Sequence, residues 1–277
     1  MSDDRFPNDE LLVSTAWLAD HLADPDVRLV EVTPPGAGYI FGHPPGAVYL
    51  NLDDVLTGRA SGVPHTVGPV DEVGRVLGRL GLAPDRRVVI YDEIGGPSAA
   101  QALWLLEYLG FPRVAVLEGG VERWMAESRP DTRAEPDVGG TSFVPVPRED
   151  RMATAEWIVS HLRDEEVCVL DCRTPQEYGE GHIPGARNRP WDRTLTRQAY
   201  QAFRGRDDLK ADLARLSATE DREIVTYCHT GYRSAHTYLT LRLLGYPRVR
   251  NYDGSWTEWG ERPDLPKADD PRREVPA

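Results

Sequence analysis

The sequence has no long apolar run and nothing at its start that resembles an export signal. Its hydrophobic segments all fall short of the roughly 18 residues that a membrane-spanning helix requires. The first ten residues, MSDDRFPNDE, are acidic and lack the basic and apolar regions of a secretory signal. We therefore expect a cytoplasmic protein that does not associate with membranes.

Basic residues are also in the minority. The chain of 277 residues contains 32 lysines and arginines against 45 aspartates and glutamates, which gives a formal net charge of -13. A surface this acidic is repelled by phosphate backbones and by anionic membranes, so a nucleic-acid partner is not expected. An anionic substrate would need a local basic site.

Cysteine is scarce, with Cys168, Cys172 and Cys228 in the whole chain. A low, odd count without an export signal indicates reduced thiols rather than a disulfide framework. Cys168 and Cys172 lie in the alternating, strand-like segment EVCVLDCR. A strand rises by about 3.3 Å per residue, so roughly 13 Å separates them, too far for a disulfide or a shared metal. Both are expected to be small buried strand residues.

The chain contains an internal repeat. The segment from Val88 to Trp124 aligns with the segment from Ile224 to Trp259, and GFPRV at 110–114 meets GYPRV at 245–249. Upstream, HPPGA at 43–47 meets HIPGA at 182–186 with a similar separation. Two copies of one domain are the simplest explanation.

Each copy alternates short apolar strands with helical patterns, which predicts an α/β domain with a mainly parallel sheet and helices on both faces. In the second copy the predicted strands are VCVLD, EIVTY and VRNY. We expect domains at 1–135 and 150–277, joined by a linker at 136–149 within a segment rich in Pro, Gly and charge. The tail after Gly260 should run extended over the surface.

Cys228 follows the strand-like run IVTY, and ligands of parallel sheets bind beyond the carboxyl ends of strands. We expect the next helix to begin near Ser234, as its N-cap, and to stop at Gly245. Gly231 permits a turn in which backbone N–H groups point inward around the sulfur. The predicted cradle consists of the backbone of His229, Thr230, Gly231, Tyr232, Arg233 and Ser234.

Such a loop would give Cys228 a chemical role. Inward N–H dipoles, the positive end of the following helix and the guanidinium of Arg233 all favour the thiolate over the thiol. A thiolate held in this way is a nucleophile, and the same cradle would hold an additional sulfur atom as a persulfide.

The sequence resembles the tandem-domain rhodaneses, the thiosulfate sulfurtransferases, over nearly its whole length. The resemblance is carried by HPPGA, HIPGA, the DCR strand end, the CHTGYRS loop and YDGSWTEWG. It implies two rhodanese-like domains, the first inactive and the second catalytic, with the active site facing the domain interface. The repeat alignment supports this asymmetry, because Asp92 stands where the second copy has Cys228 and a carboxylate cannot carry transferable sulfur.

The resemblance implies that Cys228 takes the outer sulfur of thiosulfate, releases sulfite, and passes the sulfur to cyanide, a thiol or a sulfur-carrier protein. No metal, nucleotide or organic cofactor is implied. Arg233 is expected to bind the dianion and the departing sulfite. Arg173, in DCR, matches a family arginine near the loop and either contacts substrate or braces the loop through Asp171 or Glu177. Some animal members carry an arginine where this chain has Glu177, so the chain departs from the family pattern there.

Three other interpretations compete with this one. A 3-mercaptopyruvate sulfurtransferase usually has a neutral CG[ST]GVT loop, whereas the cation of CHTGYR favours an inorganic dianion. Phosphatases and arsenate reductases use Cys-x5-Arg, a loop one residue longer than the one from Cys228 to Arg233. A relay module would deliver persulfide sulfur to a partner protein. The sequence names neither the physiological donor nor the acceptor, and it leaves the oligomeric state open.

Overall fold

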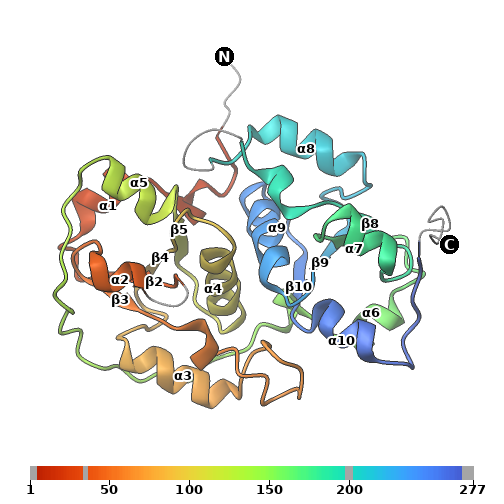
Figure 1. Ribbon diagram of the computed structural model, residues 1–277, viewed down its shortest axis with the longest axis horizontal. Coiled ribbons are helices and arrows are strands. Elements are labelled where there is room, and N and C mark those ends of the chain that lie inside the picture. Colours follow the sequence, from red (N-terminus) through yellow and green to blue (C-terminus); the bar gives the residue numbers. More distant parts are fainter. Residues whose placement is uncertain (1–4, 34–36, 197–201, 270–277) are drawn as a thin grey trace, which may run out of the picture.

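Two units of the same design lie side by side in the computed structural model, which describes residues 5–33, 37–196 and 202–269 (Figure 1). The strands are β1 (Leu12–Val13), β2 (Val27–Glu31), β3 (Ala47–Tyr49), β4 (Arg87–Tyr91), β5 (Val114–Leu117), β6 (Met152–Ala153), β7 (Val167–Asp171), β8 (Arg187–Asn188), β9 (Glu223–Tyr227) and β10 (Val249–Tyr252).

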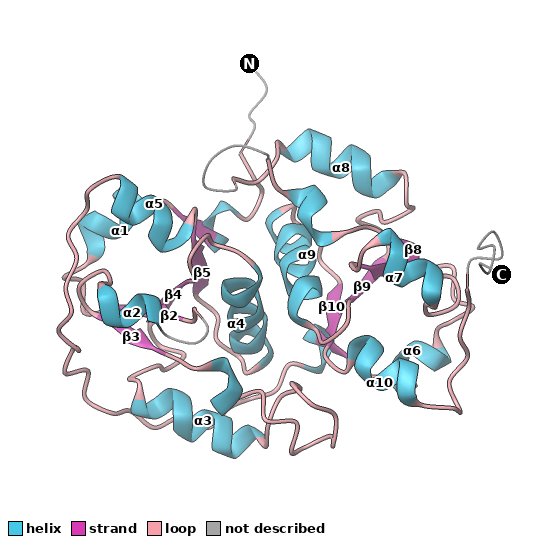
Figure 2. Ribbon diagram, viewed as in Figure 1, coloured by secondary structure: helices cyan, strands magenta, loops and turns pink. Residues whose placement is uncertain are grey.

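The helices follow the same division, with α1 to α5 in the first unit and α6 to α10 in the second (Figure 2). They are α1 (Thr15–His21), α2 (Ala37–Phe41), α3 (Val70–Arg79), α4 (Pro97–Tyr108), α5 (Gly120–Ala126), α6 (Ala155–Ser160), α7 (Pro175–Glu180), α8 (Arg206–Ala214), α9 (Tyr232–Leu243) and α10 (Ser255–Glu261).

Each unit is built on a parallel sheet of five strands. The order is β1-β5-β4-β2-β3 in the first sheet and β6-β10-β9-β7-β8 in the second, and every pair is parallel. The predicted α/β class with two matching domains is therefore confirmed. The strands predicted in the second copy are β7, β9 and β10, whereas β6 and β8 were missed because two residues give no periodic signal.

The strands of each sheet are buried on both faces, as a parallel sheet covered by helices requires. In β4, Val88 and Ile90 join the core shared with α4, while Val89 and Tyr91 join the core beneath α1, α2 and α5. In the second unit, α6, α7 and α10 cover the outer face and α9 covers the inner one. Helices on both faces are thus confirmed.

Helices α4 and α9 meet at the centre of the molecule and join the two units (Figure 1). All twelve residues of α4 are buried, because its own sheet covers one side of the helix and α9 the other. Glu107 of α4 accepts hydrogen bonds from Arg242 of α9 at 3.1 and 3.2 Å and from the hydroxyl of Tyr238. One continuous hydrophobic core therefore spans both units.

The chain between the units follows the surface of the first one. Residues 129–148 form neither helix nor strand, and they are held by backbone bonds such as Thr141 N–H to Gly78 O (2.9 Å) and Arg148 N–H to Tyr108 O (2.7 Å). The exact domain boundaries at 135 and 150 stay predictions. Within the described residues, no helix combines the length and apolar character needed to cross a membrane.

The tail after α10 packs more closely than predicted. Leu265 is buried in the outer core of the second unit, and the indole N–H of Trp259 donates to the carbonyl of Pro266 at 2.7 Å. His182 and Ala268 form an antiparallel bridge. The sequence predicted a tail that runs extended over the surface, and up to residue 269 Leu265 and these backbone contacts anchor it. Residues 270–277 lie outside the described chain.

Candidate active site

Cys228 is the first residue after β9, at the carboxyl end of the central strand of the second sheet. Its side chain is fully buried. Gly231 adopts a left-handed conformation (φ 76°) and caps α9, so the helix begins at Tyr232. The predicted start near Ser234 is therefore wrong. The glycine turns the chain into the helix two residues earlier, and the Ser234 hydroxyl lies instead 2.7 Å from Asn251 Oδ1.

Two side chains from the end of β10 and the start of α10 fix the loop. The Ser255 hydroxyl accepts the N–H groups of Cys228 (3.2 Å) and Gly231 (2.9 Å) and donates to the carbonyl of Tyr252 (2.7 Å). The amide of Asn251 donates to the carbonyl of Gly231 at 3.2 Å. The Gly231 N–H is thus engaged by Ser255, which corrects its assignment to the cradle.

The backbone carbonyls of the loop have partners in α10, whereas most of its amides have none among the described residues. The carbonyls of Cys228 and His229 accept the N–H groups of Trp256 (3.1 Å) and Thr257 (2.9 Å), so they face the start of α10. Within the described chain, no acceptor is found for the other amides of the predicted cradle, which are those of His229, Thr230, Tyr232, Arg233 and Ser234. The role of these donors as a cradle for the Cys228 sulfur stays a prediction.

The first unit contains an internal example of an anion in this place. Asp92 follows β4 as Cys228 follows β9. Its Oδ1 accepts the N–H groups of Ile94 (3.0 Å) and Gly96 (2.8 Å), and its Oδ2 accepts that of Ala99 in α4 (3.1 Å). Loop amides and the amino end of a helix therefore hold the carboxylate. The corresponding position of the second unit is taken by Cys228.

Arg233 is already paired with a carboxylate. Its two terminal nitrogens donate to the two oxygens of Glu177, at 2.9 and 2.7 Å, and this fork-to-fork contact raises the pKa of Arg233. The arginine also lowers the pKa of Glu177 to about 2, assisted by Thr174. Glu177 therefore supports Arg233 and not Arg173, because α7 carries its carboxylate towards the start of α9.

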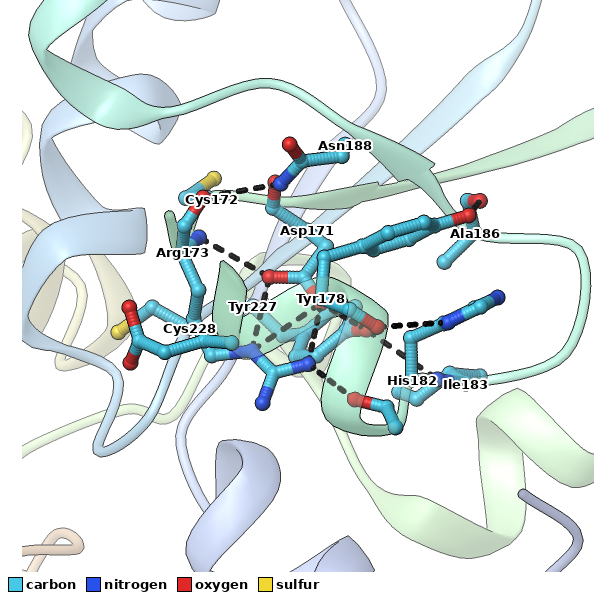
Figure 3. Close-up of polar contacts among 12 residues, drawn as sticks. Asp171, Cys172, Arg173, Tyr178, His182, Ile183, Ala186, Asn188, Tyr227 and Cys228 are labelled. Carbon is cyan, nitrogen blue, oxygen red and sulfur yellow. Dashed lines mark hydrogen bonds and ion pairs between the residues drawn. The ribbon is translucent and has the colours of Figure 1, made fainter. Parts of the chain in front are cut away.

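Arg173 is buried in a second ion pair (Figure 3). Its guanidinium donates to both oxygens of Asp171, with the shortest distance at 2.6 Å, and to the carbonyl of Gly181 at 2.6 Å. It also lies over the ring of Trp256, 4.5 Å from the ring centre. Asp171 in turn accepts the hydroxyl of Tyr227, the residue before Cys228. Arg173 thus braces the strand end through Asp171, one of the two alternatives that the sequence left open.

The other two thiols lack these features. Burial raises the pKa of Cys168 to about 11, and burial also raises the pKa of Cys172, so both remain protonated at neutral pH. Cys168 lies in β7 and Cys172 directly follows it, and both are buried and free. The expectation of small buried residues at the strand is confirmed for both. Neither thiol is a nucleophile in this state.

Sequence reasoning missed Ser255 and Asn251, the residues that hold the loop. A signal for Ser255 was present in the repeat, where it aligns with Gly120. Both positions have left-handed backbones, with φ 50° at Ser255 and φ 57° at Gly120. A side chain is unfavourable in this conformation, so a serine there indicates that its hydroxyl has a use. Asn251 carried no comparable signal.

Comparison with known proteins places the chain in a family. The rhodanese-like domain matches residues 14–127 and again residues 154–262. A thiosulfate sulfurtransferase of Azotobacter vinelandii is 37% identical over 95% of this chain and 98% of its own length. The sulfur carrier protein TtuD of Thermus thermophilus is 35% identical over 95% and 98%.

A solved structure agrees with these matches. SseA of Escherichia coli, described as a 3-mercaptopyruvate sulfotransferase with the rhodanese fold, matches with a TM-score of 0.79 at 26% identity, covering 89% of this chain and 98% of that one. Two family matches, relatives above 30% identity and a shared fold over most of the chain point to one conclusion. The protein belongs to the rhodanese family and is a tandem-domain sulfurtransferase.

Proposed function

We propose that the protein transfers the outer sulfur of thiosulfate through a persulfide on Cys228. The Cys228 thiolate attacks the outer sulfur, a new S–S bond forms, and the S–S bond of thiosulfate breaks with its electron pair leaving on sulfite. Cyanide or a thiolate then attacks the terminal persulfide sulfur. The S–S bond breaks, and the electron pair returns to Cys228 as the thiolate.

The observation that supports this proposal most directly is the loop between β9 and α9. Its buried thiol shares the loop with amides that find no acceptor among the described residues, and the side chain of Arg233 contacts Cys228. The equivalent loop of the first unit binds the Asp92 carboxylate through such amides. Because a carboxylate cannot exchange sulfur, we assign catalysis to the second unit and a structural role to the first.

The test is intact mass spectrometry after incubation with thiosulfate. We expect an increase by one sulfur atom, located on the peptide that contains Cys228 and lost on addition of cyanide, with formation of thiocyanate. An adduct on Cys168 or Cys172, or none with any donor, would contradict the proposal.

A location in the cytoplasm, where thiols stay reduced, suits the three unpaired cysteines.

Thiosulfate is proposed as the donor because relatives at 37% and 35% identity are named thiosulfate sulfurtransferases. The alternative donor is 3-mercaptopyruvate, since a relative at 29% identity is named for that substrate. Kinetics with the two donors side by side discriminate between them. A higher kcat/KM for 3-mercaptopyruvate would transfer the assignment to that donor.

A protein acceptor is a second candidate, favoured by the relative named as a sulfur carrier. In that case the Cys228 persulfide would deliver its sulfur to a partner protein rather than to cyanide. A complex that forms with the sulfur-loaded protein and is lost in Cys228→Ser would support this role. Equal capture by Cys228→Ser would oppose it.

A further inference from the structure

We infer that Glu177 discriminates among sulfur donors. Its carboxylate occupies Arg233, the cation assigned to donor binding, and so disfavours dianionic donors relative to monoanionic ones. The inference rests on the proposed function and concerns the same site. It gives a role to a residue at which the chain departs from the family pattern.

The carboxylate of Glu177 is held from two sides. At the start of α7, the backbone N–H and the hydroxyl of the N-cap residue Thr174 both donate to Oε2, at 3.0 and 2.9 Å, in a capping box. From α9, Arg233 contacts both oxygens. The anion is therefore fixed in the position that a donor's own anionic group would take on the guanidinium.

The pairing cancels the positive charge on which an anionic donor would depend. Arg233 is neutralised by Glu177, and Arg173 is neutralised by Asp171. The first unit adds negative charge near the loop. Burial raises the pKa of the Tyr232 hydroxyl, and the nearby Asp92 and Glu93 raise it further.

A donor must therefore exchange with Glu177 for Arg233. When a monoanionic donor binds Arg233, the pair is neutral, and the displaced carboxylate of Glu177 repels one negative charge. When a dianionic donor binds Arg233, the pair carries one excess negative charge, and the same carboxylate repels two. Because Coulomb repulsion is proportional to the donor's charge, the free-energy penalty for the dianion is about twice that for the monoanion. The residue is a filter for donor charge.

Glu177→Gln tests this role. Glutamine can replace glutamate in a capping box, so the contact with Thr174 can persist while the charge is removed. We expect kcat/KM for 3-mercaptopyruvate to rise about threefold and that for thiosulfate about tenfold. The free-energy penalty removed is twice as large for the dianion, so its fold-increase in kcat/KM is about the square of the monoanion's. The matched control is Glu165→Gln. Glu165 is exposed and precedes the amino end of β7, whereas Cys228 lies at the carboxyl ends of the strands, so this change removes one charge far from the site.

The outcomes separate this inference from the proposed function. If the wild-type protein loads sulfur but Glu177→Gln changes both donors equally or neither, the charge filter is wrong and the proposed function stands. If the wild-type protein loads sulfur from no donor, both are wrong. Glu177→Ala provides a second variant with the charge removed and the cap lost. The same rise in the ratio of thiosulfate to 3-mercaptopyruvate is expected for it, and an unchanged ratio would overturn the inference.

Discussion

At the scale of single residues, the environment of each sulfur separates one thiol from the other two. Cys228 lies beyond the end of its strand, in the loop that leads into α9. Cys168 and Cys172 lie at β7, where burial keeps them protonated. Because Cys172 also directly follows its strand, the surroundings of the sulfur, and not its place at a strand end, distinguish Cys228.

The first prediction follows from this difference. Cys228→Ala should abolish sulfur loading from thiosulfate, because burial keeps the thiols of Cys168 and Cys172 protonated. Cys168→Ala and Cys172→Ala should keep most of it. Mass spectrometry and thiocyanate formation measure both. Equal losses in the three variants would show that the cysteines act together and that the single-nucleophile mechanism is wrong.

Ser255 carries the second prediction at this scale. Ser255→Ala leaves the N–H groups of Cys228 and Gly231 without their acceptor, and unpaired buried donors should cost about 2–4 kcal/mol in the free energy of unfolding. Ser255→Gly should lose about 1 kcal/mol less, since glycine tolerates the left-handed backbone. Urea unfolding measures both.

If Ser255 positions the loop, both variants should also load sulfur more slowly while Tyr252 and the rest of β10 remain folded. A loss of stability with a wild-type loading rate would make Ser255 a structural residue without influence on the reaction. The comparison of rate with stability is therefore the informative measurement.

At the scale of helices and strands, the sequence predicted what depends on local pattern. The segments VCVLD, EIVTY and VRNY coincide with β7, β9 and β10, because short stretches rich in β-branched and aromatic residues between loop signals are typical of strands. The start of α9 was misplaced because a serine N-cap and a glycine turn are both plausible there, and the structure uses the glycine. Short edge strands left no pattern to detect.

The partners of charged side chains were beyond sequence reasoning. Arg173 and Arg233 were both assigned near the loop, yet which of them Glu177 contacts depends on how α7 lies against α9. That placement results from packing over many residues and has no local signature. The same holds for Asn251, whose contact with Gly231 exists only because β10 lies beside β9.

The third prediction concerns the contact between α4 and α9. Glu107 is nearly buried and holds Arg242 and the Tyr238 hydroxyl across the two units. Glu107→Ala should lower the free energy of unfolding by about 3 kcal/mol, because it leaves a largely buried cation unpaired. Chemical unfolding followed by tryptophan fluorescence measures this loss.

An exposed ion pair gives the matched control for that variant. Glu72 pairs with Arg59 on the surface of the first unit, and Glu72→Ala should cost less than about 1 kcal/mol. Similar losses in the two variants would mean that the interface between α4 and α9 contributes little to holding the units together.

At the scale of the whole molecule, the active-site loop lies against the junction of the two units. Asp253 connects them, because its Oδ2 accepts the N–H of Val67 from the first unit at 2.7 Å. Asp253 also packs against Gly231, where an added Cβ would lie 3.0 Å from its carbonyl oxygen. The tyrosine of the loop, Tyr232, lies 3.1 Å from the hydroxyl of Ser98 in α4. The first unit therefore supports the loop even without a thiol of its own.

Asp253 makes the stability of this junction depend on pH. Burial raises the pKa of its carboxyl to about 7, the Val67 N–H opposes this rise, and the charge of Glu258 adds to it. Its Oδ1 has no partner within the described residues. Because the pKa is higher in the folded state than the ordinary value near 4, the folded protein binds the extra proton between these two values. Its stabilising contribution is complete below about pH 4 and is lost by about pH 7.

The fourth prediction is that Asp253→Asn removes this dependence. The amide oxygen can still accept the Val67 N–H, and no charge forms when the pH rises. Between pH 5 and pH 8 the wild-type protein should lose roughly 2–3 kcal/mol more of its free energy of unfolding than the variant. The control is Asp208→Asn, at an exposed aspartate in α8, which should follow the wild-type curve. Parallel curves for wild type and Asp253→Asn would mean that the carboxyl ionises without cost, so that the junction is open to water beside the cysteine loop.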